Sequence, residues 1–309
     1  MAQAAVLAAN SSVLRAHEVL SFQQGPYTYH LSTENGSSIL SATDRISSVS
    51  EELLWGLGIG HMGQTYIYKR NGAFYESRLS FFSQIQELDI TPGHSRSVPG
   101  TLVEALGLQQ PQSEIERCLG CHTTQSKVEN RFDAEHAVPG VTCEACHGPG
   151  KSHVTAVKAG KADARELIFN PQRLNPVDAV DFCGACHRTW QDVVGRGLIG
   201  VGVFNVRFAP YRLENSRCWK QQDTRIVCTS CHDPHKPLVQ ESGDYDARCL
   251  SCHILRGQKK EAGKIATACP VNKKDCVSCH MPKYKPPSLH SSFTDHWIRI
   301  VRPGKPYPN

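Results

Sequence analysis

The chain has 309 residues, a formal net charge of +5 and a hydrophobic fraction of 39%. The charge is small and forms no basic block, which argues against nucleic-acid binding, and no apolar run approaches the eighteen or so residues of a membrane helix. Fourteen cysteines and fifteen histidines are many for this length. They indicate either disulfides formed in an oxidising compartment or a cofactor that consumes thiols.

The N-terminal stretch MAQAAVLAANSS lacks the basic n-region of a signal peptide, and its apolar run is short. Ala2-Gln3-Ala4 matches the small-residue pattern of a cleavage site. We therefore expect a mature or trimmed form of an exported protein, which would be periplasmic or extracellular, at the cell surface.

Residues 1–105 contain no cysteine pair, but they do contain alternating apolar and polar residues on both sides of Asn35-Gly36 and of Asn71-Gly72. Asn-Gly between two such runs is a strong hairpin signal. We predict an antiparallel β region in residues 1–105. After Pro111 the pattern changes to short helical runs broken by Gly and Pro, of which residues 113–122 are an example.

The pattern C-x-x-C-H occurs six times in residues 106–309. It is the attachment signature of c-type haem, because cysteines three residues apart can each form a thioether to one porphyrin edge while the next histidine ligates the iron. A zinc half-site or a redox dithiol would explain one pair, but not six pairs each followed by histidine. The predicted attachment cysteines are Cys118, Cys121, Cys143, Cys146, Cys183, Cys186, Cys228, Cys231, Cys249, Cys252, Cys276 and Cys279. The predicted proximal iron ligands are His122, His147, His187, His232, His253 and His280.

Nine histidines lie outside the motifs and could supply the second axial ligand of each iron. Methionine is a poor alternative, because Met281 directly follows a proximal histidine and Met62 is adjacent to a histidine. Bis-histidine ligation is therefore expected, with low-spin irons of lower potential than Met/His cytochromes have. The predicted distal ligands are His61, His136, His153, His235, His290 and His296. We expect His94 to be a turn residue, and His17 and His30 to face solvent.

Two of these distal candidates lie very close to a motif. His153 is six residues past His147, and His235 is three residues past His232. Since each residue spans at most about 3.5 Å, so short a tether does not easily carry the chain around a porphyrin to its opposite face. We predict that each of these histidines ligates a neighbouring haem and thereby fixes the distance between two irons.

Cys218 and Cys269 lie outside the motifs. In an exported protein a disulfide between them is favoured over two free thiols. Such a bridge would close a loop around the last three motifs and stabilise the fold by about 2–4 kcal/mol.

Six haems leave roughly fifty residues for each, well below an ordinary domain, so porphyrins would supply much of the core. The predicted fold is a multihaem cytochrome c, mostly coil with short α-helices around a haem array, plus the N-terminal antiparallel β region. We predict two parts: a β-rich region in residues 1–105 and a hexahaem region in residues 106–309.

The stretch GVTCEACHGPGKSH (140–153) and the later CHMPK and FTDHWIR segments resemble a family of exported bacterial multihaem cytochromes. That family is related to the tetrahaem cytochrome of nitrifiers and distantly to cytochrome c nitrite reductase. The resemblance runs from about His61 to the C-terminus and implies parallel and perpendicular haem pairs, with His153 and His136 as distal ligands. The lysine motif C-x-x-C-K, frequent at the catalytic haem of nitrite reductases, does not occur, which weakens an enzymatic interpretation.

Electron transfer through mainly bis-histidine haems is therefore the first functional hypothesis. One alternative is a subunit of an extracellular cytochrome filament, in which His17 or His30, on an extended N-terminal arm, would ligate a haem of the next copy. Another is a multihaem reductase or oxidase of a small nitrogen or sulfur species with one five-coordinate haem. The expected partners are redox proteins or further copies of the chain.

Overall fold

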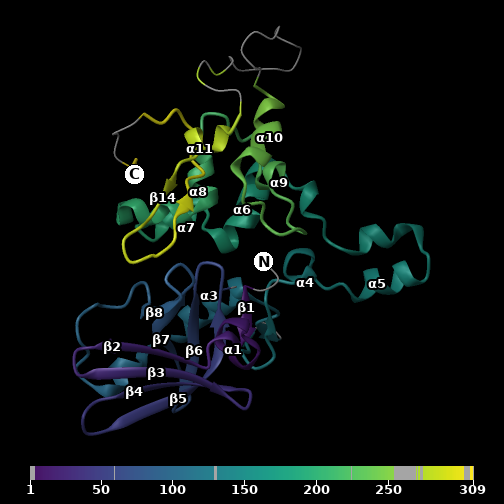
Figure 1. The fold of residues 1–309 in the computed structure, drawn as a ribbon. Helices are drawn as coiled ribbons and strands as arrows, with labels where there is room; N and C mark the ends of the chain where they lie inside the picture. The colour runs from purple at the N-terminus through teal and green to yellow at the C-terminus, as the bar shows by residue number, and fades with distance from the viewer. Residues whose placement is uncertain are drawn as a thin grey trace. The chain divides into compact units, whose positions relative to one another are not determined.

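A computed structural model describes residues 4–58, 60–128, 131–223, 225–253, 269, 271, 274–302 and 307–308. The chain forms two compact units (Figure 1). The first unit comprises Met1–Phe169 with Ser288–Ser291, and the second comprises Asn170–Pro287 with Ser292–Asn309. The predicted division near residue 105 rests on where the motifs begin, and it stays a prediction.

The first unit is built on one antiparallel sheet of nine strands (Figure 1). Its strands are β1 (Ala5–Leu7), β2 (Val19–Gln24), β3 (Tyr27–Glu34), β4 (Ser37–Thr43), β5 (Ser48–Leu57), β6 (Gln64–Arg70), β7 (Ala73–Phe82), β8 (Glu87–Ile90) and β9 (Gly107–Gln109). Strands β2 to β8 follow one another in chain order, β1 pairs with β5, and β9 pairs with β7. Because β8 also lies against β2, the sheet nearly closes on itself.

Both predicted Asn-Gly hairpins are confirmed. Asn35 and Gly36 join β3 to β4 with φ of 49° and 84°, and Asn71 and Gly72 join β6 to β7 with φ of 49° and 81°. Two consecutive residues at positive φ form the type I′ turn, whose twist matches that of the flanking strands. Asparagine and glycine tolerate this conformation better than other residues, which is why the local sequence was sufficient to predict the turns.

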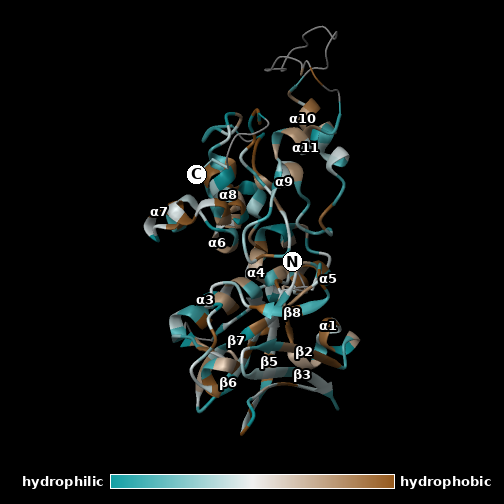
Figure 2. Cartoon of the chain, turned by 60° about the vertical axis from the view of Figure 1, so that its left-hand side comes forward, coloured by the Kyte–Doolittle hydropathy of each residue, from teal (hydrophilic) through white to brown (hydrophobic). Residues whose placement is uncertain are grey.

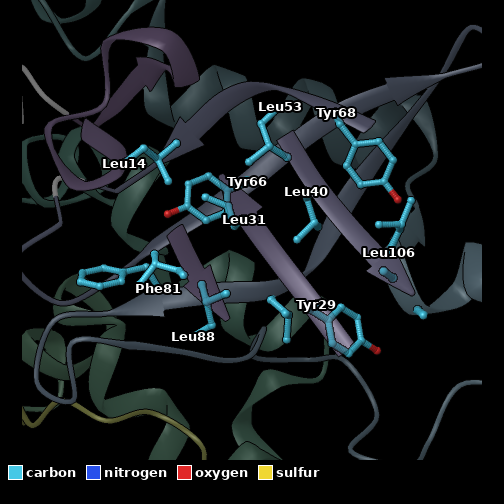
Figure 3. Close-up of a cluster of buried hydrophobic side chains, with 14 of the residues drawn as sticks. Leu14, Tyr29, Leu31, Leu40, Leu53, Tyr66, Tyr68, Phe81, Leu88 and Leu106 are labelled. Atoms are coloured by element: carbon cyan, nitrogen blue, oxygen red, sulfur yellow. The ribbon is translucent and has the colours of Figure 1, made fainter. Parts of the chain in front are cut away.

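The space enclosed by the sheet is filled with apolar side chains (Figure 3). Along β3 every second residue, Tyr27, Tyr29 and Leu31, is buried, and Leu40 and Ala42 are buried in the same way along β4. This period of two directs one face of each strand to the core and leaves the other to solvent. The first unit therefore has an apolar core of its own, formed by protein side chains.

A buried guanidinium group links β7 to the end of β2, where the sheet nearly closes. Arg78 on β7 is 6% exposed, and its Nε and Nη2 both donate to Gln24 Oε1, at 3.1 and 3.0 Å. Its Nη2 also donates to the carbonyl oxygens of Ser95 at 2.9 Å and Ser97 at 2.7 Å. A buried charge is tolerated when hydrogen bonds satisfy its donors, as they do here.

Replacing Tyr66 by phenylalanine is expected to raise the free energy of unfolding by about 1–3 kcal/mol, because a buried hydroxyl that makes no hydrogen bond destabilises the fold by that amount. Tyr66 on β6 is fully buried, and its hydroxyl has no hydrogen-bond partner among the described residues. Burial also raises its pKa, so it stays protonated. The matched control is Tyr75→Phe, which removes an exposed hydroxyl bonded to Gln109. Urea denaturation compares the two, and a loss of stability in Tyr66→Phe would contradict the expectation.

Short helices and two small two-stranded sheets complete the first unit. The helices are η1 (Ala8–Asn10), α1 (Ser12–Ala16), α2 (Leu102–Leu106), α3 (Gln112–His122), α4 (Cys143–His147), α5 (Lys151–Lys158) and η2 (Ala162–Leu167). The small sheets pair β10 (Thr123–Thr124) with β13 (Val138–Pro139) and β11 (Lys127–Val128) with β12 (Arg131–Phe132). Helix α3 confirms the helical run predicted at residues 113–122. Its Ile115 and Leu119, four residues apart on one face, are fully buried.

The second unit consists mainly of short helices. They are η3 (Pro171–Arg173), α6 (Pro176–His187), α7 (Trp190–Gly195), η4 (Leu198–Arg207), α8 (Ala209–Glu214), α9 (Cys228–Cys231), η5 (Ser242–Tyr245), α10 (Asp246–Leu250) and α11 (Cys276–His280). Strand β14 (Lys283–Tyr284) pairs with β15 (Phe293–Thr294). Side chains cap several of the helices. Asn170 accepts from the backbone of η3, Asn175 accepts from the backbone of α6, and Thr189 forms a capping box with Asp192 in α7. In the part of the chain that the structure describes, no helix is long and apolar enough to span a bilayer (Figure 2).

Candidate haem-attachment sites

All six C-x-x-C-H motifs lie on or directly after a helical turn. Helices α3, α4, α6 and α11 end at the motif histidine, α9 covers the two cysteines of its motif, and α10 contains Cys249. Beyond α10 the turn continues, because the backbone N–H groups of Cys252 and His253 both donate to the Cys249 carbonyl. Residues three and four apart share one face of a helix, so each turn presents two thiols and an imidazole on the same side. Covalent haem attachment needs that arrangement.

Three of the motif imidazoles are oriented by a backbone carbonyl. The bonds from Nδ1 join His122 to Ala4 (2.7 Å), His147 to Phe169 (2.8 Å) and His280 to Arg299 (2.9 Å). A carbonyl oxygen can only accept, so Nδ1 carries the hydrogen, and in this tautomer Nε2 is the nitrogen whose lone pair can bind a metal. Bonds of this kind fix both the tautomer and the ring orientation of a ligand, and the residues present therefore fit haem iron.

A hollow of about 410 Å³ lies beside the second motif. It is lined by His147, Pro149 and residues 166–169, which include Leu167, Ile168 and Phe169. Apolar side chains next to a metal-binding imidazole match a porphyrin, whose faces are apolar. The hollow is therefore a second observation that fits a haem at this motif.

The motif thiols of the second unit lie close to one another in chain order. Cys183 of the third motif is near enough to Cys228 of the fourth for each thiol to shift the pKa of the other, and the same holds for Cys249 of the fifth motif and Cys276 of the sixth. Cys231 of the fourth motif is near enough to Cys249 to raise its pKa, after burial, which is the larger cause. The third to sixth attachment sites thus follow one another in space as they do in sequence.

Burial keeps several of these thiols protonated in the unmodified chain. It raises the pKa of Cys118 to about 11, and with Asp246 it raises the pKa of Cys276 to about 12. Among the described residues, no three His, Cys, Asp or Glu side chains converge on a point that could hold a bare metal ion.

The distal candidates of the first unit differ in their surroundings. His153 on α5 is half-buried, and its Nδ1 donates to the carbonyl of Ala164 at 2.8 Å, as in the motif histidines above. His290 instead contacts Asp89 Oδ2 through Nε2 at 2.8 Å, and its ring packs against Phe82 at 4.6 Å. His153 thus presents a free nitrogen of the kind that iron binds, whereas Asp89 shares that nitrogen of His290.

Two further candidates of the first unit are exposed to solvent. His136 is 76% exposed and contacts Asp133 at 2.7 Å. His61 is exposed and lies just before β6. Neither is held by a backbone carbonyl in the hydrogen bonds of the described residues, so their assignment as distal ligands stays a prediction.

In the second unit, the structure brings one distal candidate next to motif histidines. The ring centroid of His296 lies 6.2 Å from that of His232. Burial lowers the pKa of His296 to about 4, with smaller effects of nearby His232 and His187 in the same direction. His235, in contrast, is 74% exposed and lies 3.4 Å from Asp233.

The three histidines not predicted as ligands are not alike. His94 is nearly buried, at 5% exposure, and contacts Glu76 Oε2 at 3.0 Å, while His30 is exposed on β3. His17 directly follows α1, where its Nδ1 donates to the carbonyl of Val13 at 2.9 Å and its ring packs against Phe81 at 5.0 Å. The segment around His17 is folded into β1, α1 and β2, which differs from the expected extended arm. The sequence did not indicate that a backbone carbonyl orients the imidazole of His17. The one local signal was that Val13 lies four residues before His17, a separation that brings two residues together in a helix.

A buried ion pair that the sequence did not reveal lies directly beside His296. Arg212 on α8 and Asp295 are both fully buried, and the guanidinium Nε and Nη2 each donate to a carboxylate oxygen at 2.9 Å. Burial alone would raise the pKa of Asp295, but the bonds and charge of Arg212 hold it below its ordinary value. Arg299 also donates to this carboxylate, at 2.6 Å.

The predicted Cys218–Cys269 bridge stays a prediction. Cys218 is half-buried and burial raises its pKa, with smaller contributions from nearby Cys231 and Cys252. Cys269 is exposed, and both residues next to it lie outside the described part of the chain.

Comparison with known proteins gives three partial matches. Residues 99–148 match the family of cytochrome c554 and c-prime, and residues 135–254 match the cytochrome c3 family. The chain is also similar to the multiheme cytochrome MtrA of Shewanella baltica (strain OS185), with 24% identity over 197 residues, which cover 58% of this chain and 47% of that relative. The chain thus spans about half the length of the curated relative it matches, and no solved structure shows a significant match. Families of cytochromes c thus match stretches on which helical turns carry the cysteine–histidine motifs, and over these stretches the chain is similar to multihaem cytochromes c.

Proposed function

We propose that the protein transfers electrons, with six c-type haems and with histidine at both axial positions of most irons. The observation that carries this proposal is the succession of thiol contacts in the second unit, from Cys183 to Cys228 and from Cys249 to Cys276. Attachment sites that lie side by side in chain order support closely spaced redox centres. When bound, each haem iron supplies a one-electron couple.

The chain itself positions and tunes those centres. The twelve motif cysteines would fix the porphyrins by thioethers, and carbonyls such as Ala4 and Arg299 hold the proximal imidazoles in one tautomer. Axial histidine, burial and hydrogen bonding to the ligand are the means by which a protein sets a haem potential. No bond chemistry on a substrate is needed for this function.

The proposed function has consequences for location and partners. Multihaem c-type cytochromes are typically exported, and we place this one in the periplasm or at the cell surface. Its partners would be redox proteins or further copies of the chain. Of the two histidines considered as inter-subunit ligands, His30 is exposed on β3 and thus the better candidate.

The proposal is tested on the holoprotein. The pyridine haemochrome absorbance and the intact mass should give six covalent haems, and electron paramagnetic resonance should show mainly low-spin signals. The reduced protein should not bind carbon monoxide rapidly, because histidines occupy both axial positions. A haem content well below six would contradict the proposal, whereas rapid carbon monoxide binding would favour an enzyme with an open iron. Filaments seen by negative-stain microscopy of the same sample would favour assembly of further copies.

A further inference from the structure

We propose that His232 and His296 are the two axial ligands of one haem iron, and that the buried Arg212–Asp295 ion pair holds His296 in place for this role. The inference rests on the proposed function, which leaves open which distal histidine serves which motif. It assigns His296 to the fourth motif, CTSCH.

The separation of the two rings is the first argument. Two imidazoles on opposite sides of one metal ion place their bonded nitrogens about 4 Å apart, since each metal–nitrogen bond is about 2 Å long. A ring nitrogen lies roughly 1.1 Å from the ring centroid when ring bonds are about 1.33 Å long. The centroids of such a pair are thus expected roughly 6 Å apart. The rings of His232 and His296 lie 6.2 Å apart.

Both rings are also held in defined orientations. His296 Nδ1 donates to the carbonyl of Thr294 at 3.1 Å, so its Nε2 lone pair is left for a metal. The backbone N–H of His232 donates to Cys228 at 3.0 Å, which continues the helical turn of the motif. The His232 ring meets Tyr245 edge-on, at 5.6 Å and 72°. Packing on one side and the helical turn on the other thus restrict the direction of this imidazole.

Hydrogen bonds fix the backbone on both sides of His296. On its N-terminal side, the Asp295 N–H donates to the Pro282 carbonyl at 3.0 Å. On its C-terminal side, Ser216 Oγ donates to the His296 carbonyl at 3.2 Å and accepts from the Ile298 N–H at 2.8 Å. The segment thus has little freedom to move the imidazole away from His232.

The ion pair is the centre of this anchorage. The Arg212 guanidinium lies over the rings of Trp297, at 4.9 Å, and Tyr307, at 4.6 Å, while it binds Asp295. Asp295 and Trp297 are the two sequence neighbours of His296, so one buried cation contacts the residue before the ligand and the residue after it. We therefore regard Arg212 and Asp295 as positioning residues for His296.

The experiment uses single and double variants of the holoprotein and counts the opened irons, meaning the haem irons that have lost an axial ligand. His232→Ala and His296→Ala should each convert one low-spin haem to a high-spin haem that binds one carbon monoxide per protein when reduced. The double variant should still open one iron, because both changes affect the same one. Two opened irons in the double variant, or none in His296→Ala, would overturn the pairing. The haemochrome content should stay at six throughout, since all twelve thioethers remain.

Methionine variants answer the same question if the alanine variants do not accumulate. His232→Met with His296→Met should give one haem with two methionine ligands if the pairing is right, and two Met/His haems if it is wrong. Magnetic circular dichroism distinguishes these species. A wild-type protein with fewer than six haems or with mainly high-spin irons would contradict the proposed function itself. Two affected irons in the double variant of a mainly low-spin protein would contradict this pairing alone.

The positioning role has its own readout. Asp295→Asn should alter the electron paramagnetic resonance signal of one haem. The double variant Asp295→Asn/His296→Ala should affect the same haem as His296→Ala alone, and no other. The matched control is Asp223→Asn, which breaks an Asp–Arg pair with Arg225 and should leave all signals unchanged. Unaltered haem signals in Asp295→Asn would contradict the role of the ion pair.

Discussion

Asp295→Asn is expected to lower the free energy of unfolding by about 3–5 kcal/mol, the range found when one partner of a buried ion pair is removed. Arg212 is fully buried and both of its bonds to the carboxylate would lose their charged acceptor. The carbonyl of Pro308, at 3.1 Å, and two aromatic rings would remain around the guanidinium, without a compensating negative charge. The loss should appear as a lower midpoint in guanidinium denaturation followed by far-ultraviolet circular dichroism.

Two matched variants separate the buried charge from other effects. Arg212→Met should be less harmful than Asp295→Asn, because Arg299 still binds the carboxylate at 2.6 Å. Asp223→Asn breaks a pair whose arginine is half-exposed, and should change the free energy of unfolding very little, because solvent screens the pair. A loss in Asp295→Asn no larger than that of Asp223→Asn would show that the buried pair does not stabilise the second unit.

The sequence allowed good prediction of features that depend on neighbouring residues. The turns at Asn35-Gly36 and Asn71-Gly72 depend on backbone conformations that few residues adopt, so two letters were enough. The helical run ending at His122 likewise depends on spacings of three or four residues. These features involve residues that are close in sequence, and for such residues the sequence determines the local structure most directly.

Features that join distant residues could not be read in the same way. The contact of β8 with β2, which nearly closes the sheet, depends on the twist accumulated over all the strands between them. Arg212 and Asp295 are 83 residues apart, and neither differs locally from a surface residue. The distal candidates could be selected from the sequence as histidines outside the motifs. Their partners could not, because the distance from His296 to His232 is set by tertiary packing.

Leu119→Ala is expected to lower the free energy of unfolding by about 2–5 kcal/mol, because a buried leucine leaves a cavity when it is truncated. Leu119 is fully buried in α3, between the two attachment cysteines of the first motif. With Ile115 it packs in a cluster that includes Trp55 of β5 and Ile67 of β6. Leu119, which lies between the two cysteines of the motif, thus packs the C-terminal turn of α3 against the sheet.

The control variants are Leu119→Met, which keeps the volume and should lose less than about 1.5 kcal/mol, and Leu167→Ala, at a position that is 43% exposed. The haemochrome content should stay unchanged in all three variants, since Cys118, Cys121 and His122 are retained. Equal stability of Leu119→Ala and Leu167→Ala would mean that α3 is held by its covalent cofactor alone. A selective loss in Leu119→Ala would instead show that protein packing fixes the first attachment site, so that the β region stabilises the motif as well as its own core.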